Sequence, residues 1–210
     1  MNLHVLYSGG LIYTKDGEAP FSTSLLLEGG GRRILIDPGW LFTVKTLERK
    51  LHERNLSSRD ITDIVLTHFH LDHMLNSMFF PNAVVHIHEL WRGKDYRKFG
   101  DMQGRLYAKV VESWKEVKEF GDREELFGCV KVFHTPYHSR EHVSFVVESD
   151  NLGRVFIPGD ICPTRLDYYD VIKGYRKDDV AWFILENSSN CDLIVFSHDE
   201  PLEPSEGRRK

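Results

Sequence analysis

The sequence predicts a mixed α/β (α+β) fold in which two β-sheets pack face to face and helices cover the outer side of each. Two observations favour it. Strand-like apolar runs alternate with segments of helical periodicity, and both halves follow the order strands, helix, strand and polar tip. Since 210 residues with 41% apolar content suffice for one full core and are few for two, we expect a single domain over residues 1–210.

The first half is expected to open with a meander of strands. Glycines 29–31 suit a hairpin turn, and Asp37-Pro38-Gly39 ends the meander. Apolar residues at helical spacing predict a helix over 44–54, and another helix is expected from Asp72 onward. Strands are expected at residues 3–7, 24–28, 33–36, 61–67 and 83–87.

The second half is expected to contain two helices and four strands. Helical spacing of apolar residues predicts a surface helix over 105–120, and residues 178–187 are typical of a capped helix. Strands are expected at residues 130–133, 143–148, 155–157 and 193–196, with a turn at 150–153.

The composition narrows the class of protein. The net charge of -5 leaves no basic excess for a phosphate backbone, so we expect no nucleic-acid partner, and the basic runs 173–177 and 208–210 are interpreted as solvated surface. No basic leader and no run of roughly 20 apolar residues is present, so we expect no membrane span. The three cysteines are widely separated and are interpreted as reduced thiols. We therefore expect a cytoplasmic protein; its oligomeric state stays open.

Histidine is the unusual residue of this sequence, because five of its 11 copies fall in the windows 68–73 and 138–142. The first window follows a β-rich run and carries His68, His70, Asp72 and His73. In an extended chain residues 68 and 70 share a face, whereas 72 and 73 point elsewhere as the helix begins, so each pair could hold one ion. Imidazole and carboxylate donors suit zinc, iron or manganese. The pattern would occur by chance roughly 0.002 times in such a chain, which favours a metal site over a polar loop.

The segment Thr67-His68-Phe69-His70-Leu71-Asp72-His73 resembles the signature of the metallo-β-lactamase superfamily. That family has a four-layer αββα sandwich with metals at the edge between the sheets, and this chain looks similar to its glyoxalase II and lactonase-like branch. Other family motifs are resembled in the expected order over nearly the whole chain. They are Thr135-Pro136-Tyr137-His138-Ser139, Phe156-Ile157-Pro158-Gly159-Asp160 and Phe196-Ser197-His198-Asp199.

Carried over by position, the resemblance implies two divalent metal ions as cofactors, zinc foremost, with iron or manganese compatible. One ion would be held by His68, His70 and His138, the other by Asp72, His73 and His198, and Asp160 would bridge both. The ions would turn a shared water into a hydroxide near neutral pH. Asp72 is also expected to act as a catalytic residue that passes a proton to the leaving group, and Asp37 to support a ligand from behind.

The resemblance implies a hydrolase acting on an ester, lactone, thioester or phosphodiester of a small molecule. Departures of this sequence from the patterns of particular family branches narrow the expected class of substrate. True β-lactamases of the family lack the full set of seven donors, glyoxalase II has a further domain for which no room follows His198, and ribonuclease Z needs an added tRNA-binding arm not found here. Lactone hydrolases share His198-Asp199, but their tyrosine three residues after the bridging aspartate is replaced by Pro163.

Two rival functions stay open. One is an iron-dependent oxidoreductase of the same fold, similar to the persulfide dioxygenases, because histidine and aspartate serve iron as well as zinc. The other is a non-catalytic module that binds a ligand in a retained pocket. The completeness of the donor set argues against the second, since a decayed site should lose donors first.

Several conspicuous residues have plainer interpretations. His86 and His88 are expected on a polar strand face because no third donor accompanies them. His134 is expected to end a strand, while His142 is a candidate to orient a ligand. Cys162 is expected to be a buried, inert thiol, with Cys129 and Cys191 uninformative. The aromatic residues near loop tips are more often core than substrate wall; they are Trp40, Phe42, Phe69, Trp91, Tyr137, Tyr168 and Tyr169.

Overall fold

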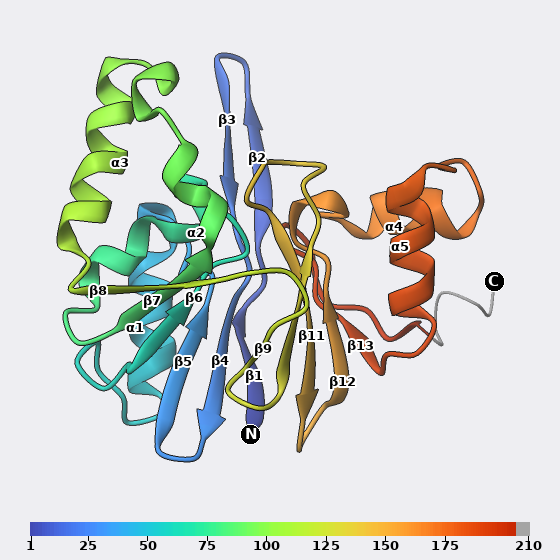
Figure 1. The fold of residues 1–210 in the computed structure, drawn as a ribbon, viewed down its shortest axis with the longest axis horizontal. Helices are drawn as coiled ribbons and strands as arrows, with labels where there is room; N and C mark the ends of the chain where they lie inside the picture. Colours follow the sequence, from blue (N-terminus) through green and yellow to red (C-terminus); the bar gives the residue numbers. More distant parts are fainter. Residues whose placement is uncertain (205–210) are drawn as a thin grey trace.

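The protein, in a computed structural model that describes residues 1–204, has four layers in the order helix, sheet, sheet, helix (Figure 1). The basic run at 208–210 lies outside the described residues. The expected αββα sandwich is confirmed. The covering helices are α1 (Val44–His52), α2 (Leu71–Met74) and α3 (Asp101–Ser113) on one side, and α4 (Arg165–Ile172) and α5 (Asp179–Ser188) on the other.

The first sheet has the strand order β1-β4-β5-β6-β7-β8, antiparallel from β1 to β5 and parallel from β5 to β8. Its strands are β1 (Asn2–Tyr7), β4 (Ser24–Gly29), β5 (Arg32–Ile36), β6 (Asp63–Val65), β7 (Val84–His88) and β8 (Glu116–Phe120). Short 3-10 turns lie on its connections, namely η1 (Leu41–Thr43), η2 (Leu75–Phe79), η3 (Glu89–Gly93) and η4 (Tyr96–Phe99).

The second sheet has the order β13-β12-β11-β10-β9 and is antiparallel except between β12 and β13. Its strands are β9 (Glu125–Leu126), β10 (Val130–His134), β11 (Val143–Ser149), β12 (Gly153–Ile157) and β13 (Leu193–Ile194), and the turn η5 (Gly159–Ile161) follows β12. A separate hairpin, β2 (Gly10–Thr14) and β3 (Gly17–Phe21), projects beyond the sheets at the top of Figure 1.

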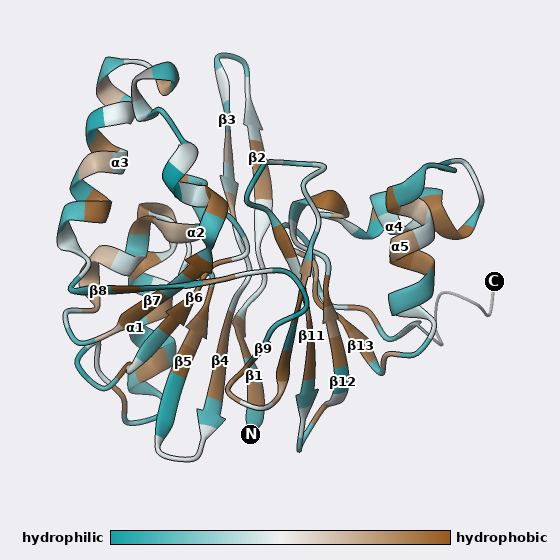
Figure 2. Ribbon diagram, viewed as in Figure 1, coloured by the Kyte–Doolittle hydropathy of each residue, from teal (hydrophilic) through white to brown (hydrophobic). Residues whose placement is uncertain are grey.

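Alternation of side chains along the strands builds three apolar layers. In β4, Leu25 and Leu27 pack between the sheets, while Leu26 packs beneath α1 and α3. In β12, Val155 faces the space between the sheets, and Phe156 packs beneath α4 and α5. Figure 2 shows hydrophobic residues along the strands of both sheets. Because both faces of these strands are buried, their sequences are near-continuous apolar runs.

The helix predicted over 105–120 is wrong in its second half. Helix α3 ends at Ser113, and Glu116–Phe120 forms β8, which pairs in parallel with β7. Trp114 already has an extended backbone (ψ 125°), and its indole donates to the Ser77 hydroxyl at 2.7 Å. Pairing with β7 therefore overrides the helical spacing that Val117 seemed to continue.

Helix α4 and the β2–β3 hairpin were not predicted. Helix α4 lacks a clear apolar stripe, since it buries Tyr168 and Val171 but exposes Leu166. Its one sequence signal is a capping box. Thr164 accepts from the Asp167 N–H at 3.2 Å, and Asp167 accepts from the Thr164 N–H at 3.1 Å. By contrast, Asp178 caps the predicted α5 by accepting from the Ala181 N–H at 2.9 Å.

The outer strands β1 and β13 are both covered by other parts of the chain. The Asn151 side chain accepts from the Leu3 N–H at 2.8 Å and donates to the Leu3 carbonyl at 2.9 Å, so it pairs with β1 as a strand would. Ile194 of β13 exchanges backbone hydrogen bonds of 2.8 and 2.9 Å with Leu202. Among residues 1–204, no helix has both the length and the apolar character that crossing a membrane requires.

Candidate metal centre

The seven predicted donors come together at one end of the sandwich, where strands of both sheets stop. The window 67–73 follows β6, His138 lies in the loop after β10, Asp160 lies in η5 after β12, and His198 follows β13. Their donor atoms form two groups, and within each group the atoms lie within 4.8 Å of one another. The first group is His68, His70 and His138; the second is Asp72, His73, Asp160 and His198.

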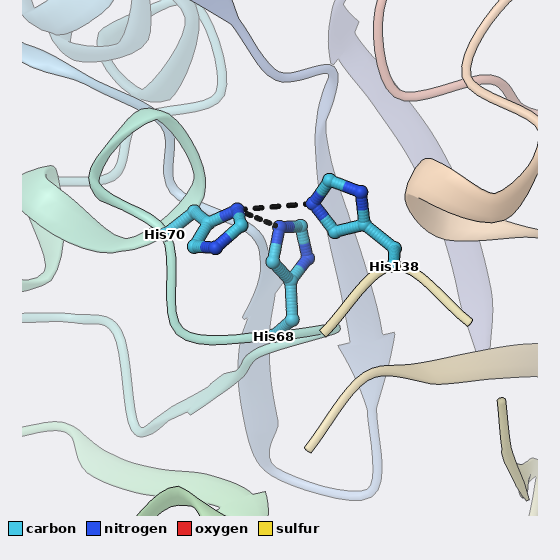
Figure 3. Close-up of side chains that lie close together, drawn as sticks. All are labelled: His68, His70 and His138. Carbon is cyan, nitrogen blue, oxygen red and sulfur yellow. Dashed lines mark hydrogen bonds between the residues drawn. The ribbon is translucent and has the colours of Figure 1, made fainter. Parts of the chain in front are cut away.

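The first group consists of three imidazoles that face a common point (Figure 3). His70 Nδ1 lies 3.0 Å from His68 Nε2 and 3.0 Å from His138 Nε2. His70 Nδ1 can share a proton with only one of these two nitrogens at a time. A cation, by contrast, could accept the lone pairs of all three nitrogens. The His68 side chain is fully buried and that of His138 is 30% exposed, so the group opens to solvent at His138.

The second group combines two imidazoles with two carboxylates. His73 Nε2 lies 3.3 Å from Asp72 Oδ2 and 3.3 Å from Asp160 Oδ1. His198 Nε2 lies 3.6 Å from Asp72 Oδ2 and 3.4 Å from Asp160 Oδ2. Asp160 Oδ2 also lies 3.8 Å from His68 Nε2 and 3.5 Å from His138 Nε2 of the first group. One carboxylate thus stands between the two groups, where a bridging ligand would be needed.

The ring nitrogens that point away from the centre are held by hydrogen bonds. His73 Nδ1 lies 2.8 Å from Asp37 Oδ2, and Asp37 Oδ1 accepts from the Thr67 N–H at 2.8 Å. His198 Nδ1 donates to the Phe21 carbonyl at 3.0 Å. Each bond favours the tautomer whose Nε2 lone pair points into the centre. Asp37 thus contacts His73 from behind, as expected. The Phe21 acceptor is a backbone carbonyl, which any residue could supply, so the sequence does not reveal it.

A buried chain of hydrogen bonds starts at His142 and supports the loop that carries Asp160. The Asp160 N–H donates to His142 Nε2 at 2.9 Å, and His142 Nδ1 donates to Thr135 Oγ1 at 2.8 Å. Thr135 donates to Ser144 Oγ at 3.1 Å, and Ser144 donates to the Pro158 carbonyl at 2.8 Å. Burial lowers the pKa of His142 to about 3, which keeps the ring neutral and able to accept. His142 thus contacts the backbone of Asp160, one of the seven predicted donors, as expected of a residue that orients a ligand.

The residues fit a metal cofactor on two independent observations. His73 Nε2 and Asp160 Oδ1 are both buried and lack a hydrogen-bond partner, although they lie 3.3 Å apart. Buried polar atoms without partners are unfavourable, so an imidazole nitrogen and a carboxylate oxygen aimed at one point fit a shared cation. The donor types, nitrogen and carboxylate oxygen without sulfur, are those that zinc, iron and manganese take.

The electrostatics of the second group favour positive charge. Burial lowers the pKa of His73, but Asp160, Asp72 and Asp37 outweigh it and hold that pKa well above its ordinary value. Burial alone would raise the pKa of Asp160, yet His73 and His68 keep it well below its ordinary value. In the first group, burial lowers the pKa of His68 strongly and that of His70 to about 4, so both rings stay neutral. Metal binds neutral imidazoles and ionised carboxylates, so an ion in the second group would take the place of the proton that the three carboxylates favour on His73.

Glu141 and Lys94 form a buried ion pair beside the first group that the sequence did not single out. Glu141 Oε1 lies 2.6 Å from Lys94 Nζ, and the Glu141 side chain is fully buried. Burial would raise the pKa of Glu141, but the Lys94 ammonium and hydrogen bonds from Lys94 and from the Phe69 N–H outweigh it and lower that pKa. A glutamate three residues after a ligand was a weak signal, because glutamate is usually a surface residue.

The other conspicuous residues lie apart from the centre or support it indirectly. His86 and His88 join no donor group within residues 1–204, but they are buried rather than on a polar face, with His86 Nε2 2.8 Å from Asp63 Oδ1. His134 ends β10, and its Nε2 lies 2.9 Å from the Arg140 carbonyl. Cys162 is fully buried, as expected, and burial raises the pKa of its thiol.

The aromatic residues divide between core and surface. Phe69, Trp91 and Tyr168 are buried, whereas Phe42, Tyr137 and Tyr169 are exposed and Trp40 is partly buried. Phe42 stacks on Phe21 at a ring separation of 5.8 Å, and Tyr137 directly precedes His138. Among these seven aromatic residues, Tyr137 is thus the exposed one that adjoins a donor in the sequence.

Known sequences that resemble this chain indicate one superfamily. Residues 17–198 match the profile of the metallo-beta-lactamase superfamily. The chain is similar to metallo-beta-lactamase domain-containing protein 1 of Xenopus laevis, 28% identical over 164 residues that make up 76% of this chain and 63% of that protein. It is also similar to a ribonuclease Z of Methanopyrus kandleri, 26% identical over 167 residues, 77% of this chain and 53% of that protein. The chain thus spans somewhat more than half the length of these relatives.

Solved structures share the fold. A Thermotoga maritima protein provisionally named a metallo-beta-lactamase is 47% identical, with a TM-score of 0.92 over 97% of this chain and 99% of that one. The dizinc quorum-quenching lactonase AidC is 18% identical, with a TM-score of 0.67 over 88% of this chain and 74% of that one, a likeness in fold alone. Because the family profile spans most of its length, the chain belongs to the metallo-β-lactamase superfamily.

Proposed function

We propose that the chain is a metal-dependent hydrolase of small molecules that works with two divalent ions, zinc being the first metal to test and iron or manganese the alternatives. One observation carries the proposal: seven donors lie in two adjacent groups, and Asp160 stands between them. A module that only binds a ligand has no need of such a set. We assign His68, His70 and His138 to one ion, Asp72, His73 and His198 to the other, and Asp160 to both.

The proposed chemistry is hydrolysis of an ester, lactone, thioester or phosphodiester. When bound, two such ions polarise a carbonyl or phosphoryl oxygen and lower the pKa of a water. The chain contributes the proton transfer through Asp72. Its side chain is 13% exposed, and its Oδ2 lies within 3.6 Å of both His73 Nε2 and His198 Nε2. Burial opposes ionisation of Asp72, but His73 lowers its pKa below the ordinary value, so Asp72 is in the ionised form that is able to accept a proton.

Names of similar proteins support the bond class without naming the substrate. They include a ribonuclease Z, the lactonase AidC and an N-acyl homoserine lactone hydrolase. The net charge of -5 argues against a nucleic-acid substrate. We therefore propose a small-molecule substrate, and a cytoplasmic location on account of three cysteines that are all unpaired. Pro163 stands where a lactonase tyrosine is expected, so lactone hydrolysis would have to proceed without that phenol.

The test combines elemental analysis with activity. We expect about two zinc, manganese or iron ions per freshly purified chain, turnover of at least one ester, lactone, thioester or phosphodiester in a substrate panel, and loss of turnover on chelation. Asp160→Asn and His68→Ala should abolish turnover and keep the circular dichroism spectrum. Wild-type turnover by metal-stripped His68→Ala would contradict the proposal.

Two other outcomes point to the rivals. One tightly held iron with oxygen uptake would instead establish an oxidoreductase. No metal after careful reconstitution would indicate a binding module.

A further inference from the structure

We propose that the buried ion pair of Glu141 and Lys94 positions the three-histidine half of the centre and sets how tightly that half holds its ion. Both are then positioning residues, since neither belongs to a donor group. The inference rests on the proposed metal centre and adds to it a device that acts on one of the two ion positions.

The pair holds the backbone on which the ligands are mounted. Glu141 Oε1 accepts from the Phe69 N–H at 3.0 Å, while Lys94 Nζ donates to the Phe69 carbonyl at 3.2 Å. Phe69 lies between His68 and His70 in the sequence, so both peptide groups that flank its Cα are engaged. The Phe69 ring is fully buried against Trp91, Tyr96, Tyr107 and Trp114, which fixes the same residue from its other side.

The same carboxylate reaches the third ligand of the group. Ser139 directly follows His138, and its hydroxyl donates to Glu141 Oε1 at 2.9 Å. One oxygen atom therefore connects the loop after β6, which carries His68 and His70, to the loop after β10, which carries His138. Glu141 makes no such contact with the second donor group, whose supports are Asp37 behind His73 and the Phe21 carbonyl behind His198; Asp37 also reaches His68, through the Thr67 hydroxyl.

Stability alone gives a poor account of this pair. Glu141 is fully buried, the Lys94 side chain is 15% exposed, and Glu141 Oε2 has no hydrogen-bond partner. Removing two charges from water is costly, and replacing a buried ion pair with apolar side chains of similar volume is often neutral or stabilising. A pair that is costly to bury and bonded to the residues beside all three ligands is better explained by their placement.

The test compares two double variants that both remove the charges. Lys94→Met with Glu141→Gln keeps an oxygen that can accept from the Phe69 N–H and the Ser139 hydroxyl. Lys94→Met with Glu141→Leu removes that acceptor. The two stepwise zinc affinities of each metal-free protein are measured by chelator competition, and the free energy of unfolding by urea titration.

We expect the Gln variant, which keeps the acceptor but loses the Lys94 bond to the Phe69 carbonyl, to weaken one of the two zinc affinities much less than the Leu variant does. The Leu variant should lose about 10- to 100-fold in one of the two affinities, the range that supporting contacts of ligands usually show. That loss should exceed any loss of unfolding free energy. Asp63→Asn is the matched control, because Asp63 is an equally buried carboxylate that pairs with Arg32 away from the donors. It should change stability and leave both affinities unchanged. Asp37→Asn should weaken the other zinc position more than the three-histidine position, because Asp37 contacts His73 directly and reaches His68 only through the Thr67 hydroxyl.

The measured zinc affinities can also contradict the positioning role. Equal zinc affinities in the Gln and Leu variants, or a loss shared equally between both ion positions, would overturn the positioning role. If the wild type itself bound no zinc, the proposed metal centre would fail, a result distinct from failure of the ion pair.

Discussion

At the scale of single residues, the backbone before Asp160 requires glycine at 159. Its φ is +63°, and a Cβ there would collide with the His142 ring. The hydrogen bond from the Asp160 N–H to His142 Nε2 exists only because the ring approaches this closely. Glycine is the residue that permits both the conformation and the approach.

Gly159→Ala is therefore expected to displace His142 and with it Asp160. The strained backbone should lower the free energy of unfolding by about 1–3 kcal/mol, measured by urea titration, and the metal content should fall below that of the wild type. Gly128→Ala is the matched control, because Gly128 also has a positive φ (+72°) but a Cβ added there would meet no atom within 4 Å. It should lower stability without changing metal content; equal metal loss in both variants would contradict the account.

The donors themselves could be predicted from the sequence, because ligand chemistry restricts residue type and four of them lie within six positions, 68 to 73. Their supports were harder to predict. Asp37 and His142 stood in or beside recognisable motifs, whereas the Phe21 carbonyl and the Glu141 carboxylate act through contacts between segments far apart in the chain. Such contacts leave no local pattern, since any residue supplies a carbonyl and glutamate is common on surfaces.

At the scale of secondary structure, strands that are buried on both faces were predictable because their apolar runs are nearly continuous. Edge elements were not. β8 is an edge strand with only Phe120 buried, so its sequence lacks an alternating pattern and continued the helical spacing of α3. The strands of the β2–β3 hairpin contain no buried residue, so their pairing is set by the turn and by their neighbours rather than by an apolar core.

The pairing of β6 with β7 brings Asp63 and His86 together and makes stability depend on pH. Burial lowers the pKa of His86 below its ordinary 6.5 despite the nearby Asp63. Burial would raise the pKa of Asp63, but hydrogen bonds from Thr62, His86 and Arg32 lower it below 3.8. Both groups bind fewer protons in the folded than in the unfolded chain, so stability is complete above pH 6.5 and is lost on acidification.

We expect His86→Gln to remove part of that dependence. Between pH 6.5 and pH 5, the metal-free variant should lose less free energy of unfolding than the metal-free wild type. Urea titration of both proteins at each pH measures this difference. His52→Gln is the control, because His52 is exposed on α1; its free energy of unfolding should fall with pH as that of the wild type does. Parallel curves for wild type and His86→Gln would show that this imidazole does not contribute.

At the scale of the whole molecule, the candidate centre joins the two sheets. The window 67–73 belongs to the first sheet, while His138, Asp160 and His198 follow strands of the second. An ion held by donors from both sheets binds the folded chain far better than the unfolded one, so it stabilises the assembled sandwich.

Removal of metal is therefore expected to lower Tm. An ion present at a hundred times its Kd contributes about 2.7 kcal/mol, which corresponds to a fall of roughly 5–10 °C per ion for a chain of this size. Calorimetry before and after chelation measures the effect, and added zinc should restore the original Tm. Asp160→Asn should respond much less, and an unchanged wild-type Tm would argue against ions shared by the two sheets.

The capping of β1 by Asn151 and of β13 by Leu202 bears on how this protein behaves when concentrated. Unpaired strand edges are templates on which other chains can add, and they are a common start of aggregation. The other two outer strands are protected differently, β8 by Glu116, Lys118 and Glu119 and β9 by its length of two residues. Each of the four edges of the two sheets thus carries a feature that disfavours the addition of further chains, and on β1, the longest of them, the Asn151 amide occupies the Leu3 backbone groups with which an added strand would pair.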